Sequence, residues 1–153
     1  MKPYEKSQQA KENFEQGYNC AQSVLLAFCD ETGLSREQAA KLASAFGGGM
    51  GRMREVCGAV SAMFMVEGLL EGYSDPKAKE EKSELYARVR TLADRFREKN
   101  HSIICRELLI DTETTPGGEP EARTKEYYER RPCGCYVEDA AYLIAEALSE
   151  SAN

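Results

Sequence analysis

Residues 46–73 of the chain read FGGGMGRMREVCGAVSAMFMVEGLLEGY. The segment opens with a glycine cluster and continues into residues 56–70, in which Ser61 and Glu67 are the strongly polar positions. Read as a helix, it has no polar face, and a helix that is apolar all round is normally a buried, central one. The sequence therefore predicts a central apolar helix at about residues 54–72.

Three features of this predicted helix bear on a site. Cys57 would lie in its first turns, directly after the glycines. Gly58 and Ala62 are four residues apart and so share one helix face, where another backbone or a cofactor can come close. Glu67 is unusual in an apolar helix, and we expect it to emerge to solvent near the helix end.

The composition limits the class of protein. The chain has 153 residues, which predicts one domain over residues 1–153, and its formal net charge is −6. An acidic chain lacks the basic face that nucleic-acid binding needs. The longest apolar run, residues 56–66, is too short to span a bilayer, and the N-terminus carries no secretory signal. We therefore expect a cytoplasmic protein without membrane insertion or a nucleic-acid partner, and the sequence leaves open whether it forms a homo-oligomer.

Helix signals recur along the whole chain, and no segment alternates with period two. Asn19 is a predicted N-cap, and Ser35 with Gln38 forms a capping box. Asp75 and Pro76 are expected to open a long charged helix. The fold class is therefore predicted to be all-α, a single-domain bundle of about six or seven helices around the central apolar one.

Six cysteines are many for a cytoplasmic chain of this size, and they accompany a single histidine. In a reducing compartment, cysteines bind metals or undergo redox chemistry more often than they form structural disulfides. A single histidine excludes zinc sites built on histidine pairs. Four cysteines lie far apart in sequence, so any site they share must be assembled by the fold: Cys20, Cys57, Cys105 and Cys133.

The local settings of these cysteines favour ionised thiols. Cys20 and Cys57 are predicted near helix N-termini, where the helix dipole stabilises a thiolate, and Arg52 and Arg54 lie close to Cys57 in sequence. The alternative is packing, because free cysteine often behaves as a small buried hydrophobe. Cys29 and Cys105 both lie on apolar helical faces, and for each of them the local sequence leaves packing and a chemical role open.

The glycines of residues 47–51 allow two interpretations. Their backbone N–H groups could cradle an anion. A tight turn between helices is the simpler interpretation and the one we favour, because glycine is ordinarily used there. Gly49, Gly51 and Gly58 are the candidate cofactor-binding residues of this region.

Four motifs occur in one order along the chain. They are GYNCAQSV at residues 17–24, GGGMG at 47–51 leading to CGAV at 57–60, CRELL at 105–109, and a cysteine ahead of VEDAA at 137–141. In this combination the chain resembles the C_GCAxxG_C_C family of putative redox-active proteins, from about residue 4 to residue 148.

The resemblance implies a redox role carried by four cysteines, which on this chain are Cys20, Cys57, Cys105 and most naturally Cys133. Cys135 competes for the fourth place, and we choose Cys133 because it stands four residues before the VEDAA segment. One departure from the family motif is Ala62, which occupies the place of its last glycine.

Three functions are compatible with this set, and the sequence leaves open whether the chain is an oxidoreductase. The first is a thiolate-bound metal or iron–sulfur cluster used in electron transfer or redox sensing, with zinc as the alternative metal. In this case the four cysteines are both the reactive residues and the ligands, and Cys135 is the alternative fourth ligand. The second is a metal-free thiol–disulfide oxidoreductase. The third is a structural zinc or interaction module. In the redox cases we expect an electron partner whose identity the sequence does not give.

Overall fold

The computed structural model describes residues 1–152, and Asn153, the last residue of the predicted domain, lies outside the described residues. The all-α prediction is confirmed, since the β pairing within residues 1–152 is one isolated bridge between Val56 and Ile104. The described elements are α1 (Pro3–Glu15), α2 (Cys20–Leu26), α3 (Cys29–Thr32), α4 (Arg36–Ala43), the 3-10 helix η1 (Ser44–Phe46), α5 (Gly58–Glu71), α6 (Lys79–Asn100), α7 (Cys105–Leu108), α8 (Lys125–Arg130) and α9 (Cys133–Ser151).

The prediction of six or seven helices is therefore too low for the described part of the chain, which contains nine α-helices. One cause is a break at Phe28, whose backbone angles, φ −115° and ψ 20°, separate α2 from α3 in the segment that follows the Asn19 cap. The short helices α7 and α8 also add to the number, and the ends and number of such short elements are the least reliable part of a sequence-based prediction.

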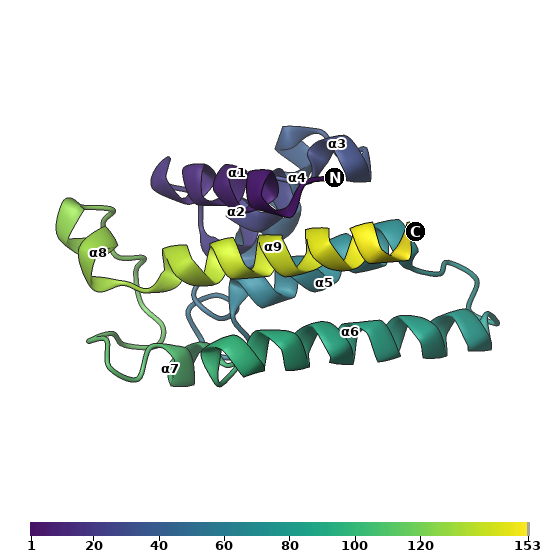
Figure 1. The fold of residues 1–153 in the computed structure, drawn as a ribbon. Coiled ribbons are helices and arrows are strands. Elements are labelled where there is room, and N and C mark those ends of the chain that lie inside the picture. The colour runs from purple at the N-terminus through teal and green to yellow at the C-terminus, as the bar shows by residue number, and fades with distance from the viewer. Residues whose placement is uncertain (153) are drawn as a thin grey trace.

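The last helix holds the other long elements together. Helix α9 packs on α1, α2, α5 and α6, and in Figure 1 it runs across the middle of the molecule with α6 on one side and α1 on the other. The chain termini lie at one end of the molecule, whereas α7, α8 and the start of α9 lie at the opposite end (Figure 1). This second end is where the candidate site is found.

Helix α5 is central, as predicted, but it begins at Gly58 and shares the centre with α2. Its first half is fully covered, including Val60 and Met63, whereas Leu69 near its end is exposed. Helix α2 is buried over a larger share of its length than α5, although the sequence pointed to α5 as the buried, central helix. Within residues 1–152, no helix has both the length and the apolar character needed to cross a membrane.

Side-chain capping fixes where several helices begin. Asn19 accepts from the Gln22 N–H while the Gln22 side chain accepts from the Asn19 N–H, and Ser35 makes the same reciprocal pair with Gln38. Both predicted caps are thus confirmed. The predicted start of α6 at residues 75–76 was wrong, because the Asp75 carboxylate accepts from the N–H two residues later and holds a turn there.

Glu67 was expected to reach solvent and does not. It is 2% exposed, because α6 packs on α5 and covers this side chain. Burial raises the pKa of Glu67, and the guanidinium of Arg88, whose Nε lies 4.0 Å from Oε1, partly offsets that increase.

The start of α5 lies against the backbone of two other elements. A Cβ atom at Gly58 would lie 2.7 Å from the carbonyl oxygen of Phe46 and 3.2 Å from the backbone nitrogen of Ala21. The predicted close backbone approach at Gly58 is therefore confirmed. The absence of a side chain at this position lets the first turns of α2 and α5 meet directly.

We predict that Gly58→Ala destabilises the protein, because a methyl group would meet a backbone oxygen that cannot rotate away. The expected loss in the free energy of unfolding is about 1–3 kcal/mol, the usual cost of overpacking. Gly68→Ala in the same helix is the matched control, since nothing lies within 4 Å of a Cβ there. The control should be neutral or stabilising by up to about 1 kcal/mol. Urea unfolding measures both, and equal stability of the two variants would contradict the prediction.

Candidate functional site

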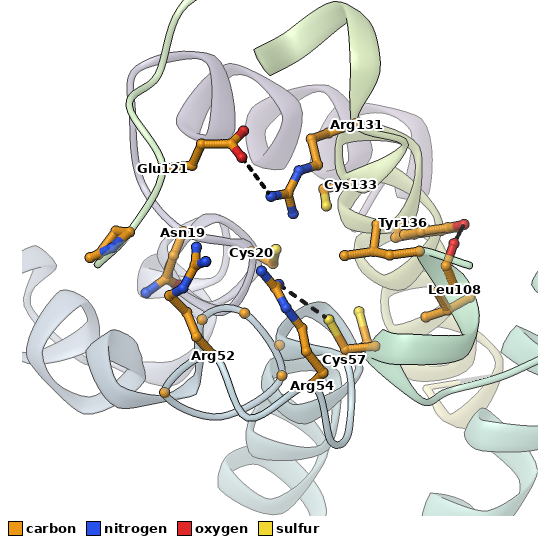
Figure 2. Close-up of a pocket in the computed structure, with 18 of the residues that line it drawn as sticks. Asn19, Cys20, Arg52, Arg54, Cys57, Leu108, Glu121, Arg131, Cys133 and Tyr136 are labelled. Carbon is orange, nitrogen blue, oxygen red and sulfur yellow. Dashed lines mark hydrogen bonds and ion pairs between the residues drawn. The ribbon is translucent and has the colours of Figure 1, made fainter. Parts of the chain in front are cut away.

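A cavity of about 280 Å³ lies where α2, α5, α7 and α9 begin. We call it the thiol cavity, because four cysteines line it: Cys20, Cys57, Cys105 and Cys133. Figure 2 shows Cys20, Cys57 and Cys133 around this space. The other two cysteines, Cys29 and Cys135, do not line it. The fold thus brings together the four predicted site cysteines, and Cys133 rather than Cys135 is the fourth.

Cys20 is placed by the cap of α2. Asn19 ends the extended backbone, and Cys20 is the first helical residue after it. The side-chain amide of Asn19 also donates to the carbonyl of Ser44, which ties this helix start to η1. The backbone N–H groups of Cys20 itself and of Gly48 in the glycine loop help to lower the pKa of the Cys20 thiol.

Cys57 and Cys105 are brought together by backbone pairing. The N–H of Cys57 donates to the carbonyl of Ile103 at 2.8 Å, and the N–H of Cys105 donates to the carbonyl of Glu55 at 2.6 Å. These two hydrogen bonds lie on either side of the isolated bridge. Gly49 completes this junction, since a Cβ there would lie 2.6 Å from the Cβ of Cys105. Two loops far apart in sequence therefore fix the two thiols.

Cys133 opens α9, directly after Pro132. One turn later, the Tyr136 hydroxyl donates to the Leu108 carbonyl at 2.9 Å and links α9 to α7 (Figure 2). Cys135 is exposed. The first turn of α9 thus turns one cysteine to the cavity and the other away from it.

The four thiols differ in acidity. The pKa of Cys20 is lowered to about 7. The largest cause is a hydrogen-bonding interaction with the Cys133 thiol, and the charge of Arg123 and nearby backbone N–H groups add to it. Burial opposes this shift but does not outweigh it. Cys20 is therefore substantially a thiolate at neutral pH.

The other cavity thiols stay protonated. Burial raises the pKa of Cys57 to about 12, and the nearby charge of Cys20 adds to the increase despite N–H groups of α5 that favour the thiolate. The pKa of Cys133 is also raised, first by its hydrogen bond to Cys20, and that of Cys105 is raised by burial. The expectation of a thiolate at Cys57 was wrong, because burial and the neighbouring Cys20 charge outweigh the helix N-terminus.

Arginines make up the charged wall of the cavity. Arg54 and Arg131 are 5% and 7% exposed, and Arg54 Nη1 lies 3.7 Å from the Cys105 sulfur. Sequence reasoning placed Arg54 near Cys57 but did not foresee its burial, and it missed Arg123 and Glu121, which also line the cavity. No local signal marks Arg123, because the loop that carries it is placed by the tertiary fold.

The predicted cofactor-binding glycines, Gly49, Gly51 and Gly58, line the same cavity. For Gly49 and Gly58, close packing against neighbouring atoms explains the residue type. Gly51 has φ +56° and open space around a Cβ, so its backbone conformation explains the glycine there. A tight, closely packed loop accounts for all three.

A metal ion needs several donor atoms grouped around one point. Thiolates are good ligands for zinc and iron–sulfur clusters. Within residues 1–152, however, no three His, Cys, Asp or Glu side chains are grouped so that they could hold a metal ion. The four thiols face one space from different walls, and as positioned they do not fit a metal centre.

Comparison with known proteins gives one match. A family model described as putative redox-active protein (C_GCAxxG_C_C) matches residues 18–147, a range that contains all four cavity cysteines. No curated protein and no solved structure matches the chain.

We predict that iodoacetamide alkylates Cys20 with a half-maximal rate near pH 7 and leaves Cys57 unmodified until far higher pH, because only the thiolate reacts. Cys133→Ala removes the largest cause of the low pKa, so the Cys20 profile should move to higher pH. Cys135→Ala removes an exposed thiol and should leave the profile unchanged. Mass spectrometry of the reduced protein follows each cysteine. A Cys20 profile that matches that of a free thiol would contradict the prediction.

Proposed function

Because the chain belongs to the C_GCAxxG_C_C family of putative redox-active proteins, we propose that it carries out thiol–disulfide exchange, with Cys20 as the attacking thiolate and Cys133 as the resolving thiol. One observation carries the proposal: two cysteines line the same cavity and oppose each other in acidity, with the pKa of Cys20 lowered to about 7 and that of Cys133 raised. An attacking thiol is most effective when its pKa is near the ambient pH, and that of Cys20 is about 7.

In the first step, the Cys20 thiolate attacks one sulfur of a substrate disulfide. A new S–S bond forms between Cys20 and that sulfur, the substrate S–S bond breaks, and the other half of the substrate leaves as a thiolate. The hydrogen bonds that hold the negative charge on Cys20 are released as that charge passes to the leaving group.

The second step depends on a change in the acidity of Cys133. In the resting state, the charge on Cys20 and the hydrogen bond to it raise the Cys133 pKa. Once Cys20 is in a mixed disulfide, its charge and its hydrogen bond to Cys133 are gone. Burial still raises the Cys133 pKa and the charge of Arg131 lowers it, so this pKa falls relative to the resting state. Cys133 can then lose its proton and attack the Cys20 sulfur, which forms the Cys20–Cys133 bond, breaks the bond between Cys20 and the substrate, and releases the second half of the substrate as a thiolate.

The products of this exchange are a Cys20–Cys133 disulfide and two substrate thiols, so the protein is oxidised by two electrons and the substrate disulfide is reduced. An external dithiol is needed to return the protein to its reduced form. Cys57 and Cys105, the other predicted reactive cysteines, face the same space as protonated thiols and have no step in this sequence.

A thiolate-bound metal or iron–sulfur cluster is the second candidate, for electron transfer or redox sensing. The observation that favours it is that four thiols from four elements line one cavity. Loading would require the thiols to move together and lose their protons. Anaerobic purification followed by metal analysis and visible absorption tests it, since a cluster absorbs visible light while zinc and disulfides do not.

We predict that the reduced protein, treated with one equivalent of bis(2-hydroxyethyl) disulfide, forms a Cys20–Cys133 disulfide. Cys133→Ser should instead accumulate a mixed disulfide at Cys20, because no thiol resolves it. Cys20→Ser should form neither product. Peptide mapping without reduction identifies each species.

The control for this experiment is Cys135→Ser, which removes a cysteine outside the cavity and should behave as the parent protein. A first mixed disulfide at another cysteine, or a Cys133→Ser protein that does not accumulate it, would sink the assignment of the two roles.

A further inference from the structure

The thiol cavity is positively charged within an acidic protein. The chain as a whole has a formal net charge of −6. Among the described residues, the cavity lining contains four arginines, Arg52, Arg54, Arg123 and Arg131, and one carboxylate, Glu121. A cavity of one sign with low-dielectric walls attracts ligands of the opposite sign.

Two of these arginines converge on one point. Nη2 of Arg54 and Nη2 of Arg131 donate to the same hydroxyl oxygen, Oγ1 of Thr114, at 2.6 and 3.1 Å. Two cationic groups are therefore held within a few ångströms of each other, and both side chains are more than nine-tenths buried. Figure 2 shows them entering the same space from opposite sides. Their mutual repulsion is unfavourable unless negative charge lies between them.

Among the described residues, the cavity lining sets two negative groups against its four arginines: the Cys20 thiolate and the Glu121 carboxylate. Glu121 accepts from Arg131 at 3.4 Å, but its other oxygen pairs with Arg130, outside the cavity lining. The partners of Arg54 within residues 1–152 are uncharged: a hydroxyl, a backbone carbonyl and the protonated thiol of Cys105.

Both buried guanidinium groups also retain unused donors. Nε of Arg54 and Nε of Arg131 are buried and have no hydrogen-bond partner among the described residues. In that same part of the chain, the side-chain hydrogen bonds of Arg131 all come from Nη2. A buried donor without a partner is costly, and a guanidinium is suited to a carboxylate or phosphate, which can accept two parallel hydrogen bonds.

We infer that the thiol cavity binds an anionic small molecule whose carboxylate or phosphate group is held between Arg54 and Arg131, beside Cys20. As a statement about the substrate of thiol exchange, this inference rests on the proposed function. The substrate class is then a small disulfide that carries negative charge. Its acidic group anchors it to the arginines while its sulfur lies next to the attacking thiolate, and the cavity of about 280 Å³ limits it to a small molecule.

Binding is tested first with probes that cannot undergo exchange. Suberate has the chain length of 3,3′-dithiodipropionate with methylenes in place of sulfur, inorganic phosphate represents the other anion class, and 1,6-hexanediol is the neutral control. Titration calorimetry of the reduced protein at low salt should show saturable binding of at least one anion and none of the diol. The anion that binds more tightly identifies the acidic group. Absence of saturable binding by both anions overturns the inference.

Variants assign the binding to the two arginines. The double variant Arg54→Gln with Arg131→Gln should weaken anion binding about tenfold or more, because charged hydrogen bonds are lost. Arg97→Gln is the control, since it removes a positive charge from an exposed pair with Asp94 outside the cavity lining. Unchanged binding in a folded double variant overturns the assignment. The comparison of anions with the diol uses the parent protein and does not depend on variant folding.

Exchange rates separate this inference from the proposed function. The dianionic 3,3′-dithiodipropionate and the neutral bis(2-hydroxyethyl) disulfide are compared, each relative to its rate with a free cysteine peptide. The dianion should be favoured at Cys20 by about tenfold at low salt, and the preference should fall as salt screens the arginines. Equal relative rates overturn the inference and leave thiol exchange intact. Anion binding without reaction at Cys20 overturns thiol exchange and supports the anion site.

Discussion

The close approach at Gly58 is the constraint on which the rest of the structure depends. The first turns of α2 and α5 meet backbone to backbone there, with the Phe46 carbonyl and the Ala21 nitrogen at distances that leave no room for a side chain. The same contact that starts the buried core brings Cys20 and Cys57 to one place. The absence of a side chain at Gly58 therefore contributes both to the packing of the core and to the assembly of the site.

The remaining two thiols are added by elements that also close the core. The antiparallel bridge of Val56 with Ile104 fixes Cys105 beside the start of α5, and Gly49 allows the loop to lie against it. Helix α9, which contacts four other helices, begins with Cys133. Because each thiol lies at the beginning of a packed helix, its backbone is held by the core, whereas the thiol itself faces the cavity.

Features that depend on local sequence patterns could be predicted from the sequence. The caps at Asn19 and Ser35 follow from side chains three residues from their partners, and the apolar run of α5 from its composition. Features that depend on contacts between distant elements could not be predicted in this way. Burial of Glu67 depends on α6, and the protonated state of Cys57 depends on Cys20, thirty-seven residues earlier. The cavity cysteines could be chosen from family motifs, but the paired arginines could not, because their convergence on Thr114 appears only in three dimensions.

The electrostatics of the cavity favour one thiolate over several. Each ionised thiol raises the pKa of its neighbours, and the charge of Cys20 already acts in this way on the other three cavity cysteines. A metal centre built on these residues would have to displace three further protons and pull the thiols together, whereas exchange chemistry uses the single charge that the resting cavity holds. The four arginines leave this cavity positive even with Cys20 and Glu121 ionised, so an anionic substrate can lie beside a thiolate without net repulsion.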